Sequence, residues 1–155
     1  MKTSKIIKEK KLSYYKKRAW EQFSRYIRFR DSKNGYSKCC TCEIIDEWRY
    51  LQAGHFIAGR NNSILFLEDN CHAQCVGCNF FGSNSKSYGK YFEFMKRHYG
   101  LPRIDELMAL SNRIVLFTRE DYQKIEETYK QKFIDLEKER ENPNDLPGNR
   151  NSTSN

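Results

Sequence analysis

The chain has 155 residues, a length that suits one domain with its own hydrophobic core. Its 28 Lys and Arg residues against 20 Asp and Glu residues give a formal charge of +8 at pH 7, which favours a polyanionic partner such as nucleic acid. The longest apolar runs have four residues, which excludes a membrane-spanning helix, and the lysine-rich Met1–Leu12 segment is no secretory signal. We therefore expect a cytoplasmic protein with no membrane partner.

The positive charge is concentrated at the start of the chain. Residues 1–38 contain thirteen Lys or Arg residues and three Asp or Glu residues. Apolar residues recur at steps of three and four over Leu12–Arg30, which predicts a helix with Trp20 and Phe23 in the core. The candidate DNA contacts are basic residues mostly off this stripe, with one from a later loop: Lys16, Lys17, Arg18, Arg25, Arg28 and Arg60. A basic face that meets only solvent is the alternative.

Beyond a break at Asn34-Gly35, the pattern predicts two strands. Trp48–Ile57 combines aromatic and apolar residues around a glycine and has strand character. Residues 58–62 form a loop. Ile64–Leu67 suits a short second strand or the lead into one, and residues 70–75 are expected to extend it.

The second half of the chain is predicted to be helical. Tyr88–Tyr99 and Ile104–Leu110 suit two helices separated by a glycine and a proline, and Thr118-x-x-Asp121 caps a third. The third helix carries one apolar stripe, made of Tyr122, Ile125, Tyr129, Phe133 and Leu136. This stripe suits either a homodimer seam or packing on the chain's own core. Residues 142–155, rich in Asn, Ser and Pro, are expected to be disordered.

Two Cys-x-x-Cys pairs predict a structural zinc ion. Cys39, Cys42, Cys75 and Cys78 have the spacing of a four-thiolate zinc site, and six cysteines in a reducing compartment favour metal ligands over disulfides. Buried reduced cysteines are the alternative. Cys40 and Cys71 lie beside these pairs, and although either could replace a ligand, the spacing favours packing roles for both.

Between the two pairs lies His55, which follows Gly54 on the first predicted strand. A histidine on a strand is more often structural than catalytic. The flanking cysteine pairs and the downstream Asn70 and Asn79 make a catalytic His55 the better interpretation. His98 is expected to face the dipole at a helix end.

Gly54-His55, Asn70 and Cys75-x-x-Cys78-Asn79 resemble the motif of HNH, or ββα-metal, nucleases. More specifically, the chain resembles the lambdoid phage NinG (Rap) recombination proteins over about residues 14–110. The matching phrases are Ala19-Trp20-x-x-Phe23-Ser24-Arg25-Tyr26-Ile27-Arg28, Gln52-Ala53-Gly54-His55-Phe56-Ile57 and Asn70-x-His72-Ala73-Gln74-Cys75-x-x-Cys78-Asn79. The resemblance implies an α+β fold in which a zinc-stapled core, a β-hairpin plus a helix, is surrounded by α-helices.

The resemblance also implies a metal-dependent endonuclease that cleaves branched DNA, such as a Holliday junction, during phage recombination. His55 would be the general base, Asn70 would brace the loop and orient the His55 ring, and Asn79 would bind a catalytic Mg²⁺ or Mn²⁺. The chain departs from the pattern at Gly54, where such sites often have a metal-binding acid. Four residues could complete the site, and the sequence does not rank them: Glu43, Asp46, Asp69 and His72.

The predicted organisation is a basic helical segment over residues 1–38, a zinc-knuckle nuclease core over 39–100, helices over 101–141 and the tail. Two alternatives to the nuclease stay open. One is a zinc-stabilised DNA-binding accessory protein of recombination without catalysis, which the missing acid favours. The other is a protein-interaction zinc domain, which the positive charge of residues 1–38 argues against as the whole function.

Overall fold

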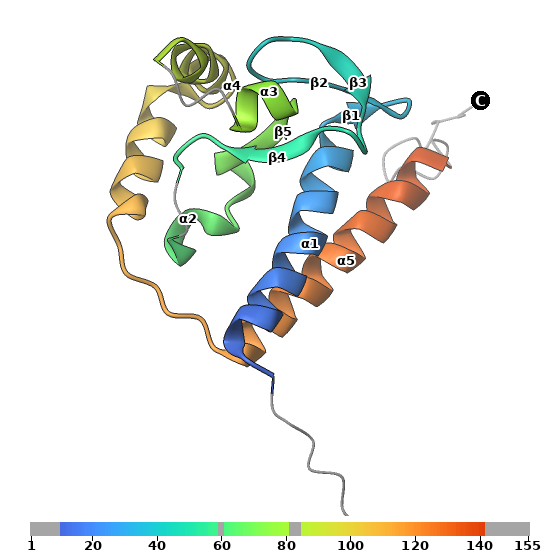
Figure 1. Ribbon diagram of the computed structural model, residues 1–155, viewed down its shortest axis with the longest axis vertical. Helices are drawn as coiled ribbons and strands as arrows, with labels where there is room; N and C mark the ends of the chain where they lie inside the picture. Colours follow the sequence, from blue (N-terminus) through green and yellow to red (C-terminus); the bar gives the residue numbers. More distant parts are fainter. Residues whose placement is uncertain (1–9, 59–60, 81–84, 142–155) are drawn as a thin grey trace, which may run out of the picture.

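The computed structural model describes residues 10–58, 61–80 and 85–141, and its centre is a small two-stranded hairpin between helices (Figure 1). Strands β4 (Gln52–His55) and β5 (Cys71–Gln74) pair antiparallel, with Gly54 opposite His72 and His55 opposite Cys71. Because side chains alternate along a strand, each face of this hairpin presents every second residue. The two faces have different partners.

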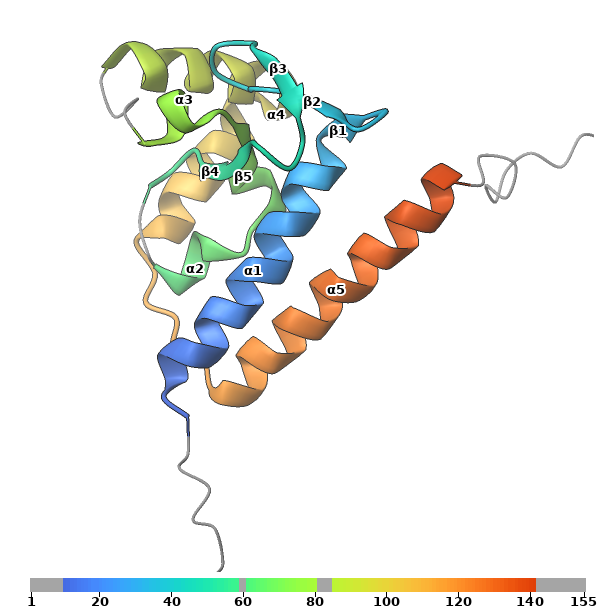
Figure 2. The same ribbon diagram turned by 45° about the vertical axis from the view of Figure 1, so that its right-hand side comes forward.

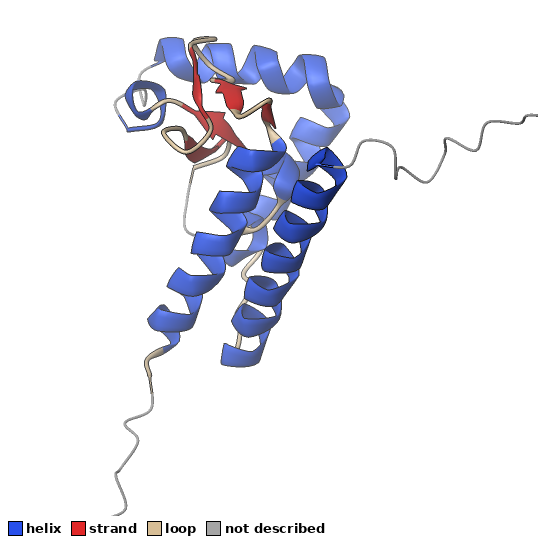
Figure 3. Ribbon diagram, turned by 90° about the vertical axis from the view of Figure 1, so that its right-hand side faces the viewer, coloured by secondary structure: helices blue, strands red, loops and turns tan. Residues whose placement is uncertain are grey.

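The first face packs on helix α1 (Leu12–Arg30), which has the bounds that the sequence predicted. Ala53 and Cys71 from the hairpin join Phe23 and Ile27 from α1 in one buried cluster. Helix α5 (Arg119–Glu141) lies along the other side of α1 and runs in the same direction (Figures 1 and 3).

The apolar stripe of α5 packs against α1 of the same chain. The ring of Phe23 meets that of Tyr129 edge to face at 4.8 Å, and Phe29 meets Phe133 at the same distance. Arg140 donates to the Phe29 carbonyl and so fixes the far end of α5. Of the two uses that the sequence left open for this stripe, packing on the chain's own core is the one observed.

The second face of the hairpin is covered by α3 (Val76–Phe80) and α4 (Ser85–Ser111) (Figure 2). The Tyr91 hydroxyl of α4 donates to the Gly54 carbonyl, and Tyr91 belongs to a second buried cluster with Phe56 and Met95. Helix α4 kinks at Gly100, whose φ of +78° lies outside the helical range, so the two helices predicted there are confirmed as two arms of one element.

A three-stranded sheet precedes the hairpin and was not predicted. It consists of β1 (Ser32–Lys33), β2 (Tyr36–Lys38) and β3 (Ile45–Glu47) in the order β1-β2-β3. Most of its residues are exposed, so its strands lack the apolar alternation that marks a half-buried strand. The loop between β2 and β3 carries the first cysteine pair.

Ile64–Leu67 is not a strand but leads into one, since β5 forms within the predicted residues 70–75. The structure has a short helix, α2 (Asn62–Leu65), followed by a 3₁₀ turn over Glu68–Asn70. Asn61 caps α2, since its side chain accepts a hydrogen bond from the Ser63 N–H, and the helical turn buries Ile64 and Leu65 together. A local cap and burial of two adjacent side chains decided against a strand.

Other predicted elements are confirmed within narrower bounds. The strand expected at Trp48–Ile57 is only β4, because residues 48–51 form a turn and bend. The capping pair is present, because the Thr118 N–H and hydroxyl both donate to the Asp121 carboxylate. The tail over 142–155 lies outside the described residues, among which no helix has the length and apolarity to cross a bilayer.

Candidate metal and catalytic site

The four predicted zinc ligands converge. Cys39 and Cys42 come from the β2–β3 loop, Cys75 follows β5, and Cys78 lies in α3. All four Sγ atoms lie within 4.8 Å of one another, and the Sγ atoms of Cys42 and Cys75 are 3.6 Å apart. Tetrahedral Zn–S bonds of about 2.3 Å place sulfurs about 3.8 Å apart, so this donor set fits a structural zinc ion.

Backbone hydrogen bonds hold the two halves of the cluster together. The Cys40 N–H donates to the Ala73 carbonyl, which ties the first cysteine loop to β5. Burial opposes ionisation of Cys39, but backbone N–H groups of the two loops stabilise its thiolate and lower its pKa to about 7. A thiolate is the form that binds a metal.

The two remaining cysteines lie outside the cluster. Cys71 is fully buried among Phe23 and Ile27, and burial raises the pKa of its thiol well above the ordinary value. Cys40 packs against the cluster around Tyr91, and burial raises its pKa as well. Protonated, buried thiols serve packing. The geometry therefore agrees with the prediction that the ligands are Cys39, Cys42, Cys75 and Cys78 and that Cys40 and Cys71 are packing residues.

His55 is the last residue of β4, and two contacts fix its ring. Its Nε2 lies 2.9 Å from the Leu65 carbonyl, and its plane stacks on Trp20 at 5.1 Å between centroids. A carbonyl only accepts, so Nε2 carries the proton of the neutral ring and Nδ1 is left as an acceptor. Burial lowers the pKa of His55, against a smaller opposite effect of the Leu65 carbonyl, which keeps the imidazole neutral near pH 7.

Asn70 clamps the segment that supports this histidine. Its side chain is fully buried, its Oδ1 accepts from the Ile57 N–H at 2.9 Å, and its Nδ2 donates to the carbonyls of Ile57 and Ile64. Ile64 precedes Leu65, whose carbonyl binds the His55 ring. Asn70 therefore braces both ends of the loop and acts on His55 through the backbone of α2.

Asn79 lies on the other side of β4 from His55. Its Nδ2 donates to Gln52 Oε1 at 2.7 Å, and its Oδ1 would be 3.0 Å from a Cβ on Gly54. Gln52 and Gly54 share one face of β4, whereas His55 faces α1. The structure thus brings Asn79 next to Gly54 but places it and the His55 ring on opposite faces of the strand.

These features accompany a family match that covers most of the chain: the model described as "Bacteriophage Lambda NinG protein" matches residues 1–139. The chain belongs to the NinG family. No curated protein and no solved structure matched it.

The arginines that the sequence proposed for DNA contact make internal contacts in this NinG family member. Arg18 forms a two-pronged ion pair with Glu126, Arg25 lies over the Phe133 ring, and Arg28 donates to backbone carbonyls of Arg49 and Leu51. These contacts join α1 to α5 and to the turn before β4. Arg18 and Arg28 use hydrogen bonds for this, whereas Arg25 makes a cation–π contact.

Lys16 and Lys17, the two lysines of α1 proposed for DNA contact, differ in their surroundings. The Lys16 ammonium donates to Asn62 of α2, one helical turn from the Trp20 ring that covers His55. Lys17 is largely exposed, with a long contact of 3.9 Å to Glu21. Arg60 lies outside the described residues.

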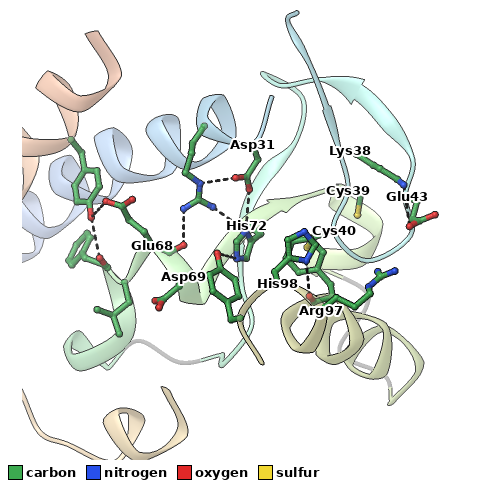
Figure 4. A pocket seen from close by; sticks show the side chains of 16 residues that line it. Asp31, Lys38, Cys39, Cys40, Glu43, Glu68, Asp69, His72, Arg97 and His98 are labelled. Carbon is green, nitrogen blue, oxygen red and sulfur yellow. Dashed lines mark hydrogen bonds and ion pairs between the residues drawn. The ribbon is translucent and has the colours of Figure 1, made fainter. Parts of the chain in front are cut away.

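Three of the four residues offered in place of the missing acid line a different cavity of about 1100 Å³: Glu43, Asp69 and His72 (Figure 4). His72 is almost completely buried, with Nε2 on the Tyr99 hydroxyl and Nδ1 near the Arg30 guanidinium and the Asp31 carboxylate. Asp69 and Glu43 pair with Arg103 and Lys38.

His72 lies directly across the hairpin from Gly54, but its two ring nitrogens are engaged by Tyr99 and by Arg30 and Asp31. Asp46, the fourth candidate, binds the backbone N–H of Glu47 on β3. In this structure each of the four candidates is engaged in another contact.

Two neighbours of His55 and Gly54 were missed by the sequence reasoning in this NinG family chain. Trp20 packs against the core cluster as expected, and it also stacks on the His55 ring, which was not foreseen. Gln74 was not considered, although it lies on the same face of the hairpin as Gly54. The glycine itself was the available signal, because a glycine before a functional residue often leaves space for a neighbouring group.

Proposed function

We propose that this chain is a metal-dependent endonuclease that cleaves branched DNA in phage recombination, with His55 as general base. The observation that carries this proposal is the setting of His55: a neutral imidazole at the end of a strand, with Nε2 held by a backbone carbonyl. Its Nδ1 has no hydrogen-bond partner among the described residues, and the ring is partly exposed. A fixed, neutral and unpartnered ring nitrogen suits removal of a proton from water.

The zinc cluster and Asn70 have supporting roles in this proposal. The zinc ion would bind the β2–β3 loop to the start of α3 and so hold the hairpin that carries His55. Asn70 would keep α2 and the Leu65 carbonyl in place, so that the His55 ring cannot turn away from its substrate. Both act at a distance from the reacting atoms.

Asn79 is the proposed protein ligand of a catalytic Mg²⁺ or Mn²⁺, since a carboxamide oxygen is a ligand that these ions accept. When bound, such an ion supplies positive charge that stabilises the phosphate in the transition state. His55 and Asn79 face opposite sides of β4, but His55 is the last residue of the strand. A phosphodiester lying across the end of the strand can therefore meet both side chains.

The lysines at the start of α1 are the proposed DNA contacts, in preference to the arginines that join α1 to α5. Lys16 and Lys17 lie on the turn before Trp20, and Lys10 and Lys11 precede the helix. Phosphate contacts of this kind are salt-sensitive and tolerant of sequence, which suits recognition of a branched structure.

A cleavage assay on labelled linear, flap and four-way DNA, with and without Mg²⁺ or Mn²⁺, tests this proposal. We expect His55→Ala to abolish nicking while leaving gel-shift affinity within about threefold, because the base touches a single phosphate. His98→Ala is the matched control, since His98 is exposed on α4 and bonds only its own helix. Wild-type cleavage by His55→Ala would remove the enzyme proposal.

The second candidate is a zinc-stabilised DNA-binding accessory protein without catalysis. The opposite facing of His55 and Asn79 favours it. In the same experiment this candidate predicts salt-dependent binding of branched DNA without cleavage in either metal.

A further inference from the structure

The position of Gly54 is filled by an amide from the neighbouring strand. A Cβ on Gly54 would lie 1.8 Å from Gln74 Oε1 and 3.0 Å from Asn79 Oδ1. The first distance is far inside van der Waals contact, so no side chain fits at Gly54 while Gln74 keeps its place. The space that an acidic residue would use before the histidine is already occupied by an oxygen atom.

Hydrogen bonds of the two amide nitrogens fix the direction of the two oxygens. Gln74 Nε2 donates to the Thr41 hydroxyl at 2.6 Å, and Asn79 Nδ2 donates to Gln52 Oε1 at 2.7 Å. With both nitrogens engaged elsewhere, the oxygens of Gln74 and Asn79 flank the same point beside the Gly54 Cα.

Neither oxygen accepts a hydrogen bond from any residue that the structure describes. Gln74 is only 4% exposed overall, and its oxygen adjoins the space beside Gly54. An unpaired oxygen on a buried side chain, next to a second unpaired oxygen, is an arrangement that a hard cation would satisfy.

We propose that Gln74 supplies, from β5, the oxygen ligand that Gly54 cannot supply. Gln74 Oε1 and Asn79 Oδ1 would together hold one Mg²⁺ or Mn²⁺, with water completing the coordination. The role of this ion in cleavage rests on the proposed function, but its binding is a separate property. The inference explains both the glycine before His55 and the burial of Gln74.

Binding of Mn²⁺ to the zinc-loaded full chain, followed by electron paramagnetic resonance, tests the site without any cleavage. Gln74→Met keeps the length of the side chain and removes the oxygen, and we expect it to weaken Mn²⁺ binding at least about tenfold. Gln74→Glu keeps an oxygen and adds charge, so it should bind Mn²⁺ at least as tightly as wild type.

The control is Thr41→Val, which removes the hydroxyl that accepts from Gln74 Nε2 but keeps Gln74 and its Oε1 atom. It should weaken Mn²⁺ binding less than Gln74→Met does. Zinc content and circular dichroism must match wild type in every variant, because Gln74 precedes the zinc ligand Cys75.

A sharper test moves the proposed oxygen ligand from Gln74 on β5 to position 54 on β4. Gly54→Asp alone should lose Mn²⁺ binding or misfold, because its Cβ meets Gln74. The double variant Gly54→Asp with Gln74→Ala removes the clash and returns a carboxylate to the site, so it should regain Mn²⁺ binding to at least the wild-type level. A folded double variant that does not bind Mn²⁺ would contradict the assignment.

The outcomes separate this inference from the nuclease proposal. If wild type cleaves DNA but folded Gln74→Met binds Mn²⁺ as wild type does, the Gln74 site is wrong and the nuclease stands. If Mn²⁺ binding follows Gln74 but wild type cleaves no DNA, the site stands and the nuclease falls.

Discussion

Removal of the Asn70 side chain should destabilise the fold and loosen the position of the His55 ring. Asn70→Ala deletes one accepted and two donated hydrogen bonds of a fully buried residue, and it leaves the Ile57 N–H without its partner. At about 1 kcal/mol for each of the two donated bonds, and about 1–3 kcal/mol for the N–H left without its partner, the unfolding free energy should fall by about 3–5 kcal/mol. For a chain of this size, that loss corresponds to about 6–20 °C in Tm.

Urea unfolding followed by circular dichroism measures this loss, with the slope checked for two-state behaviour. Asn112→Ala is the control, because Asn112 is exposed and bonds only its own helix, so its effect should stay within about 0.5 kcal/mol. If the enzyme proposal holds, Asn70→Ala should also slow cleavage at temperatures where it is fully folded, since Leu65 then loses its anchor. A change in unfolding free energy below about 1 kcal/mol for Asn70→Ala would refute the clamp.

Two further predictions concern zinc and pH. Cys75→Ser should release zinc and unfold at least the hairpin, because structural zinc binding contributes about 10–16 kcal/mol to folding. Metal analysis and circular dichroism measure the zinc content and the fold of the variant. A folded variant without zinc would contradict this prediction. Because burial lowers the pKa of His55 below its ordinary 6.5, the unfolded chain binds the proton more readily, so the His55 contribution to stability is present above pH 6.5 and is lost as the pH falls below it. Urea midpoints from pH 7.5 to 5 should therefore fall more steeply for wild type than for His55→Gln, and equal slopes would show that the ring is not desolvated.

The features that the sequence predicted well have short-range causes. The apolar periodicity predicted both ends of the helix Leu12–Arg30 correctly. The spacing of the cysteines predicted the four that come together in the fold, which are Cys39, Cys42, Cys75 and Cys78. Each of these signals is carried by neighbours in the chain, so a single sequence contains it in full.

The features that the sequence alone could not give depend on contacts between distant parts of the chain. Ile64–Leu67 has the composition of a strand, yet burial of Ile64 and Leu65 under neighbouring elements and the Asn61 cap make α2 helical. The arginines of α1 read as a DNA-binding face, and only the position of α5 reveals that Arg18 has a partner at Glu126. Gln74 could not be selected because its direction depends on Thr41, 33 residues away.

One structural consequence concerns how this region could be inherited or engineered. Helix α1 fills one face of the hairpin, and Asp31 at its end accepts a hydrogen bond from the Ala73 N–H of β5. A fragment cut at Cys39 would therefore uncover Ala53 and Cys71 and lose the ring above His55. The half that carries the four-cysteine cluster therefore depends on α1, and any recombined or engineered chain that keeps this half must keep the preceding helix as well.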